Sequence, residues 1–361
     1  MTPKENAMAI FERRQPDTYN DFMTSLAFVR DPIFARDAIP RDGKIHRDTW
    51  GTPFLFKLDA PGAHPVNEGP NAVIQDITKW REQVTVPTFD GLDWSEAEAK
   101  AKAVDREEKF LAMFCTRGLF ERSHHLMGMQ NAFMNYMVYP EEMAALLRVI
   151  ADTKIEQIKL VAEHLHPEVI FYHDDWGSKQ NVFLPPDLWR EIIKPLHTEI
   201  VKTAHDCGIL FVHHADCICQ PIVNDMVDMG IDIWQGVIPQ NDIVEIQRVT
   251  EGKLAMIGGV DGPAIDIANI TEEQIRGEVR RAIDTYCPAG RFYPSLPVRC
   301  FREWNNSIAM DELQRYGAEW ARKHPILPGS ALGWSLLPSW WTVVTIAMKS
   351  GCVASSPAMV A

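Results

Sequence analysis

The sequence has no excess of positive charge. Its 361 residues include 36 Lys and Arg against 49 Asp and Glu, which gives a formal net charge of −13. A nucleic-acid binder needs a basic face for phosphate contacts, so this charge argues against that class of protein. It also argues against a polyanionic substrate, unless arginines are concentrated at one site.

The sequence also lacks a paired cysteine framework and a secretory signal. None of the seven cysteines forms a C-x-x-C pair, and Cys217 and Cys219 are too close together for an ordinary structural zinc knuckle. Residues 1–14 are charged and have no apolar core segment. We therefore expect a cytoplasmic, reducing environment.

The remaining composition is that of an ordinary globular protein, with 46% hydrophobic and 24% charged residues. The chain is long enough for one large α/β domain or two small ones. From residue 169 onward, short apolar runs alternate with helical patterns. The predicted strands are 169–172, 209–212, 233–237, 254–257 and 291–293; the predicted helices are 186–205, 222–229, 243–249, 272–284 and 304–323.

Five strand–helix repeats in succession predict a parallel sheet. An open doubly wound sheet is the alternative, but no G-x-G-x-x-G motif opens any repeat, which disfavours a nucleotide-binding fold. We therefore predict an α/β fold, a (β/α)8 TIM barrel with an irregular, helical N-terminal cap.

We expect a single barrel domain over residues 1–325, with the cap and the first strand region in residues 1–100. A charged pattern predicts one helix from Trp94 to about Phe114, and a second helix is predicted over 140–166. Residues 326–361 form an atypical apolar tail. Because Pro338 interrupts its uncharged stretch, the tail does not qualify as a membrane span, and we assign it no function.

The polar residues that follow two successive predicted strands are the main candidates for chemistry. Asp174 and Asp175 follow the strand 169–172, and His214 and Asp216 follow the strand 209–212. Parallel strands place functional groups at their carboxyl ends, so these side chains are expected to converge. His214 and Asp216 are two residues apart and should face the same way. The pair can act as a base with its orienting carboxylate, or as two metal ligands with Asp175 or Cys217 as a third. A solvated loop is the alternative for each pair.

Further residues are predicted to line a substrate site. Asp261 follows Gly258-Gly259-Val260, whose glycines allow close backbone approach to a ligand. The aromatic residues Tyr172, Trp176, Phe183 and Trp234 are expected to form a flat apolar wall, and Asp174 is expected to contact the substrate beside it, although aromatic residues in a barrel are more often in the core.

Taken in order, several segments resemble the uroporphyrinogen decarboxylase superfamily, and more closely its methyltransferase branch that serves corrinoid proteins. They are Thr2-Pro3-Lys4-Glu5-Asn6, Asp48-Thr49-Trp50-Gly51, Asp174-Asp175-Trp176-Gly177, residues 189–195, His214-Ala215-Asp216, Gly230-Ile231-Asp232, Gly258-Gly259-Val260-Asp261, and the segment from Asn305-Asn306 to Tyr316-Gly317. The resemblance covers most of residues 1–323. It implies a TIM barrel with its site at the C-terminal mouth.

Two departures from the family pattern narrow the expected activity. No arginine-rich RQAGRY-like motif is present, so porphyrinogen decarboxylation is only the alternative, with Arg299 and Arg302 as the nearest basic candidates. The thiol methyltransferases of the family hold zinc through H-x-C and a later cysteine. Here those positions are occupied by His214-Ala215-Asp216 and by Ser295-Leu296.

We therefore expect methyl transfer between a small methylated compound and cobalamin or a corrinoid protein. A methoxylated aromatic compound or a methylated amine would be the donor, with tetrahydrofolate-linked transfer as a variant. The resemblance implies His214, Asp216 and Asp175 as catalytic residues, and a divalent metal such as zinc is a tentative cofactor. The partners expected are the small substrate and a corrinoid-binding protein, with no nucleic acid and no membrane.

Overall fold

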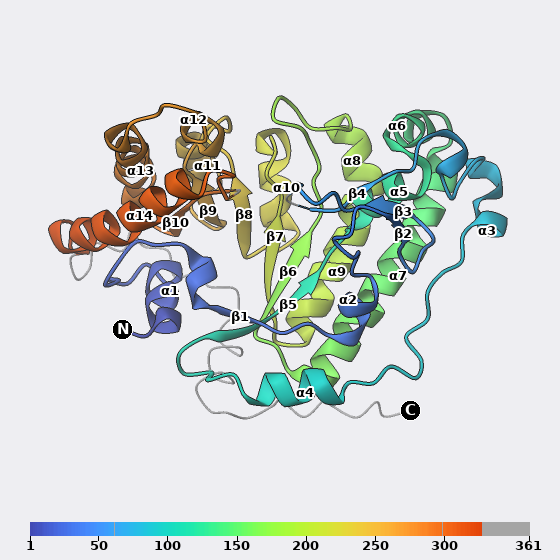
Figure 1. The fold of residues 1–361 in the computed structure, drawn as a ribbon, viewed down its shortest axis with the longest axis horizontal. Helices are drawn as coiled ribbons and strands as arrows, with labels where there is room; N and C mark the ends of the chain where they lie inside the picture. The colour runs from blue at the N-terminus through green and yellow to red at the C-terminus, as the bar shows by residue number, and fades with distance from the viewer. Residues whose placement is uncertain (61, 298, 327–361) are drawn as a thin grey trace.

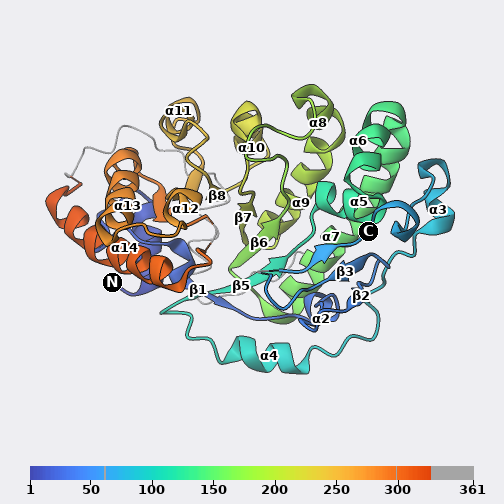
Figure 2. The ribbon, with the colours of Figure 1, turned by 45° about the horizontal axis from the view of Figure 1, so that its top comes forward.

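The fold is built around a curled parallel sheet (Figures 1 and 2). The computed structural model describes residues 1–60, 62–297 and 299–326. Seven parallel strands pair in the order β1-β5-β6-β7-β8-β9-β10. They are β1 (Leu26–Phe28), β5 (Phe110–Cys115), β6 (Val169–His173), β7 (Leu210–His214), β8 (Ile233–Val237), β9 (Ala255–Gly259) and β10 (Phe292–Ser295). The predicted α/β barrel architecture is confirmed, with seven paired strands in the described part of the chain where eight were expected.

Helices connect the strands and cover the outer side of the sheet (Figure 1). They are α5 (Leu119–Met127), α6 (Met129–Val138), α7 (Pro140–Leu165), α8 (Pro186–Ile192), α9 (Lys194–Asp206), α10 (Val223–Asp228), α11 (Ile243–Val249), α12 (Gly262–Ile265), α13 (Glu272–Tyr286) and α14 (Glu303–Lys323), with short 3-10 turns η4 (Gln220–Ile222) and η5 (Cys287–Ala289). One cluster of buried apolar side chains extends from Ala7 to Ala321.

The helix predicted over 186–205 is two helices, α8 and α9. The break lies at Ile193, directly before Lys194-Pro195. Proline has no N–H to donate and its ring clashes with the preceding turn, so the first helix ends there and the second begins.

The helix predicted from Trp94 to Phe114 is wrong in its second half. Only α4 (Ser95–Lys102) is helical, and the apolar run from Phe110 to Cys115 is strand β5. This strand is buried on both faces by its neighbours and by helices, so its sequence is continuously apolar and has no alternation. Periodicity alone cannot separate such a strand from a buried helix.

The N-terminal segment lies beside β1 and β10 (Figure 1). It contains α1 (Pro3–Phe11) and the 3-10 turn η1 (Phe22–Ser25). The Tyr293 hydroxyl of β10 donates to the Ala7 carbonyl at 2.7 Å, and the Ser295 hydroxyl donates to the Asp21 carboxylate at 2.6 Å. The Phe22 ring packs edge-on against Tyr293. Side chains of this segment thus connect β10 to the start of the barrel.

A small antiparallel sheet covers the carboxyl end of β5. Its order is β2-β3-β4, and the segment around it also contains α2, α3 and two 3-10 turns. Their bounds are β2 (Ile45–Arg47), β3 (Pro53–Leu55), β4 (His64–Pro65), α2 (Pro32–Arg36), η2 (Gly69–Asn71), η3 (Ile77–Lys79) and α3 (Trp80–Gln83). The buried Asp48 carboxylate pairs with Arg122 of α5 at 2.5 Å and with Arg117 at 3.3 Å. Asp48 also accepts hydrogen bonds from the Trp50 and Thr52 amides, so this aspartate both shapes its turn and attaches it to α5.

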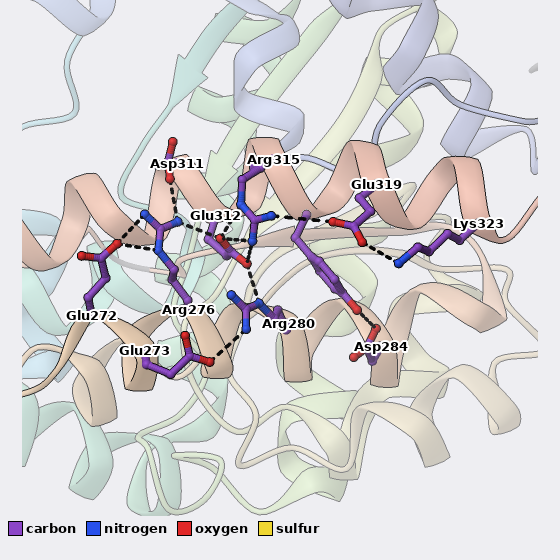
Figure 3. Close-up of polar contacts among 11 residues, drawn as sticks. Glu272, Glu273, Arg276, Arg280, Asp284, Asp311, Glu312, Arg315, Glu319 and Lys323 are labelled. Carbon is purple, nitrogen blue, oxygen red and sulfur yellow. Dashed lines mark hydrogen bonds and ion pairs between the residues drawn. The ribbon is translucent and has the colours of Figure 1, made fainter.

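Helices α13 and α14 are joined by a network of ion pairs (Figure 3). The Glu312 side chain is fully buried and accepts hydrogen bonds from Arg276 at 2.7 Å, Arg280 at 2.6 Å and Arg315 at 2.6 Å. Arg276 also pairs with Asp311 at 2.6 Å. The buried carboxylate is thus surrounded by guanidinium groups, the arrangement in which charge burial is tolerated.

In the part of the chain that the structure describes, no helix is long and apolar enough to cross a membrane. The apolar tail expected at 326–361 lies outside the described residues except for Ile326, and the domain boundary at residue 325 stays a prediction.

Candidate active site at the mouth of the barrel

Three neighbouring strands bring polar side chains into one row. His173 ends β6 and His214 ends β7, and the two residues are partners in the parallel register. His214 is in turn the register partner of Gln235 in β8. Partners on adjacent strands share a face of the sheet, so these three side chains lie side by side on the inner face, at the carboxyl end of the strands.

His173 forms an ion pair with Glu121, a residue of α5. Nδ1 of His173 lies 3.0 Å from the Glu121 carboxylate. Burial acts to lower the pKa of His173, but the charge and hydrogen bond of Glu121 outweigh it and raise the pKa to about 9. Burial would raise the pKa of Glu121, and the positive His173 lowers it instead. The pair is therefore an imidazolium and a carboxylate at neutral pH.

His214 is held in the opposite protonation state. Its Nδ1 is hydrogen-bonded to Oε1 of Gln235, and its ring stacks on that of His173 with centroids 4.2 Å apart. Burial, with the neighbouring positive charge of His173 as the second cause, lowers the pKa of His214 to about 4. A neutral imidazole thus lies against a charged one.

Asp175 and Asp216 complete the site. The Asp216 amide donates to Oδ1 of Asp175 at 3.0 Å, and burial, together with the charge of Glu121, raises the pKa of Asp175 to about 7. The Asp216 carboxylate pairs with Lys179 at 2.9 Å. We call the six residues Glu121, His173, Asp175, His214, Asp216 and Gln235 the mouth cluster. It is partly open to solvent, since the side chains of His173 and Asp216 are 33% and 22% exposed.

Part of the mouth cluster can hold a metal ion. Donor atoms of His173, Asp175 and His214 lie within 4.8 Å of one another. The structure therefore brings His214 together with His173 and Asp175, and not with the predicted ligands Asp216 and Cys217. The Cys217 thiol is buried and lies 3.5 Å from the thiol of Cys219.

An aromatic wall lines the inner face beside the mouth cluster. Phe28 stacks on Phe114 with centroids 4.1 Å apart, Phe114 contacts Phe171, and Phe171 lies 5.8 Å from the ring of His214. Phe28 and Phe114 are only partly buried. Flat apolar rings beside acid and base groups suit a planar organic ligand.

The aromatic wall predicted from the sequence is not the one observed. Tyr172 and Trp176 contact His197 of α9, and Trp234 is the register partner of the outward-facing His213. All three aromatic side chains are fully buried between the sheet and the helices. Side chains alternate between the two faces of a strand, so Tyr172 and Trp234 face away from the inner side where His173 and Gln235 lie.

His213 lies in the same outer layer, as the alternation predicts. It stacks on Trp176 at 4.0 Å, and neither nitrogen of His213 nor of His197 has a hydrogen-bond partner among the described residues. Burial lowers the pKa of His197 to about 3 and that of His213 well below its usual range.

Asp174 has a structural role in place of the predicted substrate contact. Its carboxylate accepts hydrogen bonds from the Glu121 amide at 2.9 Å, the Phe120 amide at 3.2 Å and the Trp176 indole at 2.9 Å. It thereby caps the start of α5 and fixes the backbone of Glu121. Gly118 makes this approach feasible, because a Cβ at that position would lie 2.4 Å from the Cβ of Asp174.

Asp261 also caps a helix. It accepts the Ala264 amide at 3.1 Å, at the start of α12, and Gln240 donates to its other oxygen at 3.2 Å. The predicted role of Asp261 in substrate binding is therefore not supported by these contacts.

Sequence reasoning missed Glu121, His173 and Gln235. His173 could have been found by the alternation rule, because it precedes Asp175 by two residues. Gln235 is a polar residue in an otherwise apolar strand, which is a weaker signal. Glu121 lies on a helix 52 residues before His173, and nothing local marks it.

Comparison with known proteins supplies the family. Residues 117–293, which include the whole mouth cluster, match the family described as Uroporphyrinogen decarboxylase (URO-D). Residues 117–293 therefore place this part of the chain in the family. No curated protein sequence matches the chain.

Among solved structures, a methyltransferase from Methanosarcina mazei is similar, with a TM-score of 0.56 and 13% sequence identity over 88% of this chain and 99% of the other. The apo 3-keto-D-glucoside 4-epimerase from E. coli matches with a TM-score of 0.34, 11% identity, and coverage of 63% of this chain and 84% of the other. At 13% identity, the likeness to the methyltransferase shows a shared fold and nothing further. The TM-score of the epimerase match is too low to show even a shared fold.

Proposed function

We propose that this protein is a methyltransferase that moves a methyl group from a methoxylated aromatic compound to cobalamin or a corrinoid-binding protein. The observation that carries the proposal is the aromatic wall of Phe28, Phe114 and Phe171 next to the mouth cluster. Similarity in fold to the Methanosarcina mazei methyltransferase supports it. Of the two donors expected from the sequence, the aromatic ether fits the flat phenylalanine wall better than a methylated amine does.

The protein's task in such a reaction is to position the ether and to stabilise its leaving oxygen. A corrinoid would supply the nucleophile that receives the methyl group. As the bond between the methyl carbon and the ether oxygen breaks, negative charge develops on that oxygen. The charged His173, with Asp175 and the neutral His214 beside it, is placed to donate a hydrogen bond or a proton there. Glu121 keeps His173 protonated and oriented.

The openness of the site supports a large second partner. His173 and Asp216 are 33% and 22% exposed, so a corrinoid carried by another protein can approach the mouth cluster from solvent. Tetrahydrofolate remains the variant for the acceptor.

The decarboxylase alternative is less well supported. A porphyrinogen carries many carboxylates and needs free arginines. Arg299 pairs with Glu303 at 2.8 Å, and Arg302 donates to the Asp266 carbonyl at 2.9 Å. Both candidate arginines are thus engaged away from the mouth cluster.

The test is demethylation with reduced cobalamin or a reconstituted corrinoid protein as acceptor. A panel of methoxylated benzoates and phenols is compared with methylated amines. Release of the free phenol by chromatography, matched by a change in cobalamin absorbance, is the expected result. Turnover of amines alone, or carbon dioxide release from uroporphyrinogen without any demethylation, would reject the proposal.

A further inference from the structure

We propose that His173, Asp175 and His214 bind one divalent first-row metal ion, in a site without thiolate ligands. The inference goes beyond the proposed methyl transfer, because ion binding can be measured without substrate or corrinoid. The observation behind it is a three-residue donor group whose members are each held by a partner of their own.

The donor atoms are already gathered. They come from the adjacent strands β6 and β7 and from the residue two positions after β6, and they lie within 4.8 Å of one another. Bonds of about 2 Å to a shared ion bring donors closer still, so binding would draw the three side chains together. Two imidazoles and one carboxylate suit ions such as Zn²⁺, Fe²⁺ and Co²⁺.

Each ligand is oriented by a second residue. Glu121 holds Nδ1 of His173 and Gln235 holds Nδ1 of His214, so Nε2 of each ring is the atom that would face an ion. Nε2 of the charged His173 would give up its proton as the ion binds. The Asp216 amide holds Oδ1 of Asp175, which leaves Oδ2. A carboxylate or amide oxygen on the far nitrogen of a histidine is the usual support for a metal ligand.

The charges at the mouth favour a cation as well. Three carboxylates, Glu121, Asp175 and Asp216, face two cations, His173 paired with Glu121 and Lys179 paired with Asp216. A dication beside Asp175 would balance this excess of acidic groups.

The thiolate set known from the thiol methyltransferases does not fit this chain. Asp216 occupies one cysteine position and pairs with Lys179. Ser295 lies near the other, and its hydroxyl donates to Asp21. The Cys217 and Cys219 thiols are buried against each other. The ion expected here is therefore bound through nitrogen and oxygen.

The role of the ion rests on the proposed function. Its open coordination positions would face solvent at the mouth, where the lone pair of the ether oxygen can bind. The bound ion would then stabilise the negative charge that develops on that oxygen as the methyl group leaves.

The test uses the full chain, stripped with a chelator and titrated with Zn²⁺ by calorimetry and with Co²⁺ by absorption spectroscopy. One ion per chain is expected, with a Co²⁺ spectrum that lacks thiolate charge-transfer bands. His173→Ala and His214→Ala should each weaken binding about 100-fold or more. Glu121→Gln should weaken it about 10- to 100-fold, the size usual for a supporting residue.

Cys217→Ser is the matched control and should bind within about threefold of the parent protein, because the buried Cys217 thiol contacts Cys219. Circular dichroism confirms that each variant is folded; His173→Gln replaces the alanine variant if that one is not. Absence of stoichiometric binding, binding that survives loss of both histidines, or loss of binding in Cys217→Ser would each overturn the site. Methyl transfer measured with and without chelator separates this outcome from failure of the proposed function.

Discussion

Charged side chains meet at two places in the molecule, between α13 and α14 and at the mouth cluster, and the two places use them differently. Between the helices, the buried Glu312 is contacted by three arginines, each at 2.6–2.7 Å (Figure 3). At the mouth, His173 has one carboxylate partner, and the rings of His173 and His214 stack in opposite protonation states. The first arrangement holds two helices together. The second arrangement leaves polar atoms available to bind a substrate or an ion.

This comparison separates stability from chemistry. A group whose hydrogen bonds are all made within the protein contributes to folding, and removing it leaves its partners unpaired. A group kept incompletely bonded is available to a substrate or ion, at some cost to stability. Substitutions in the two regions should therefore affect different measurements.

The largest effect is expected from His214→Ala on turnover. Loss of this imidazole should lower kcat for demethylation about 100-fold or more, the range of acid–base and hydrogen-bonding contributions. The free energy of unfolding should fall by no more than about 1–3 kcal/mol, because the ring carries no charge and its removal leaves the buried Gln235 without this partner. His46→Ala, which removes a partly exposed histidine of β2 bonded to Asp42, serves as the control and should leave kcat unchanged. Equal losses in turnover for both variants would contradict the assignment.

Glu312→Gln should show the opposite pattern. Removing the charge leaves Arg276, Arg280 and Arg315 facing one another without a carboxylate. The free energy of unfolding, measured in urea, should fall by about 2–3 kcal/mol. The loss is smaller than for a fully buried ion pair because the arginines are partly exposed. Turnover at a temperature well below the melting transition should not change. The Glu273 side chain is 76% exposed, so Glu273→Gln should lower the free energy of unfolding by less than about 0.5 kcal/mol. A large effect of Glu273→Gln would mean that surface pairing and not burial holds the helices.

Asp31 offers a third kind of carboxylate, buried and incompletely bonded but away from the mouth cluster. It caps α2 through Oδ1, while Oδ2 has no partner in the described residues, and burial raises its pKa to about 6. The folded protein therefore holds this proton more tightly than the unfolded chain, and the wild type loses stability as pH rises from about 4 to about 6.

The variant Asp31→Asn keeps the cap and carries no charge. Above pH 6 it should be more stable than the wild type by about 2–3 kcal/mol, and below pH 4 the two should be equal. Urea unfolding at several pH values measures the difference. A difference that does not depend on pH would rule out ionisation of Asp31 as its cause.

The smallest effect is expected from Lys179→Ala. This exposed lysine pairs with Asp216 beside the mouth cluster. Its loss should leave stability within about 0.5 kcal/mol. Because Asp216 would lose its cation, KM for an acidic methoxybenzoate should rise severalfold while kcat is retained, and KM for a neutral methoxyphenol should not change. Initial rates with the two substrates separate these outcomes.

The convergence of the mouth residues could be predicted because it follows from chain order. Successive parallel strands end at the same edge, and Asp175 and His214 follow two such strands. The rule that placed His214 and Asp216 on one face would also have found His173 beside Asp175. It would also have excluded Tyr172, the immediate neighbour of His173.

Other features depend on contacts between distant segments and have no local signal. Glu121 reaches His173 only because Asp174 caps α5 and Gly118 allows that approach. The supporting role of Gln235 depends on the register between β7 and β8. Phe28 lies in β1 and Phe114 in β5, and both reach Phe171 because these strands pair next to β6. The irregular N-terminal sequence did not allow the bounds of β1 and β5 to be predicted.

The buried histidines have a consequence for the pH dependence of stability. Burial is the largest cause of a lowered pKa at five histidines, which therefore stay neutral in the folded state: His124, His125, His197, His213 and His214. Below about pH 6.5 the unfolded chain takes up protons that the folded chain excludes. Each such histidine then lowers stability by about 1.4 kcal/mol per pH unit down to its own folded-state pKa, while the contribution of His173 stays constant because it is protonated in both states below pH 6.5. Acidification below about pH 6.5 should therefore destabilise the fold progressively.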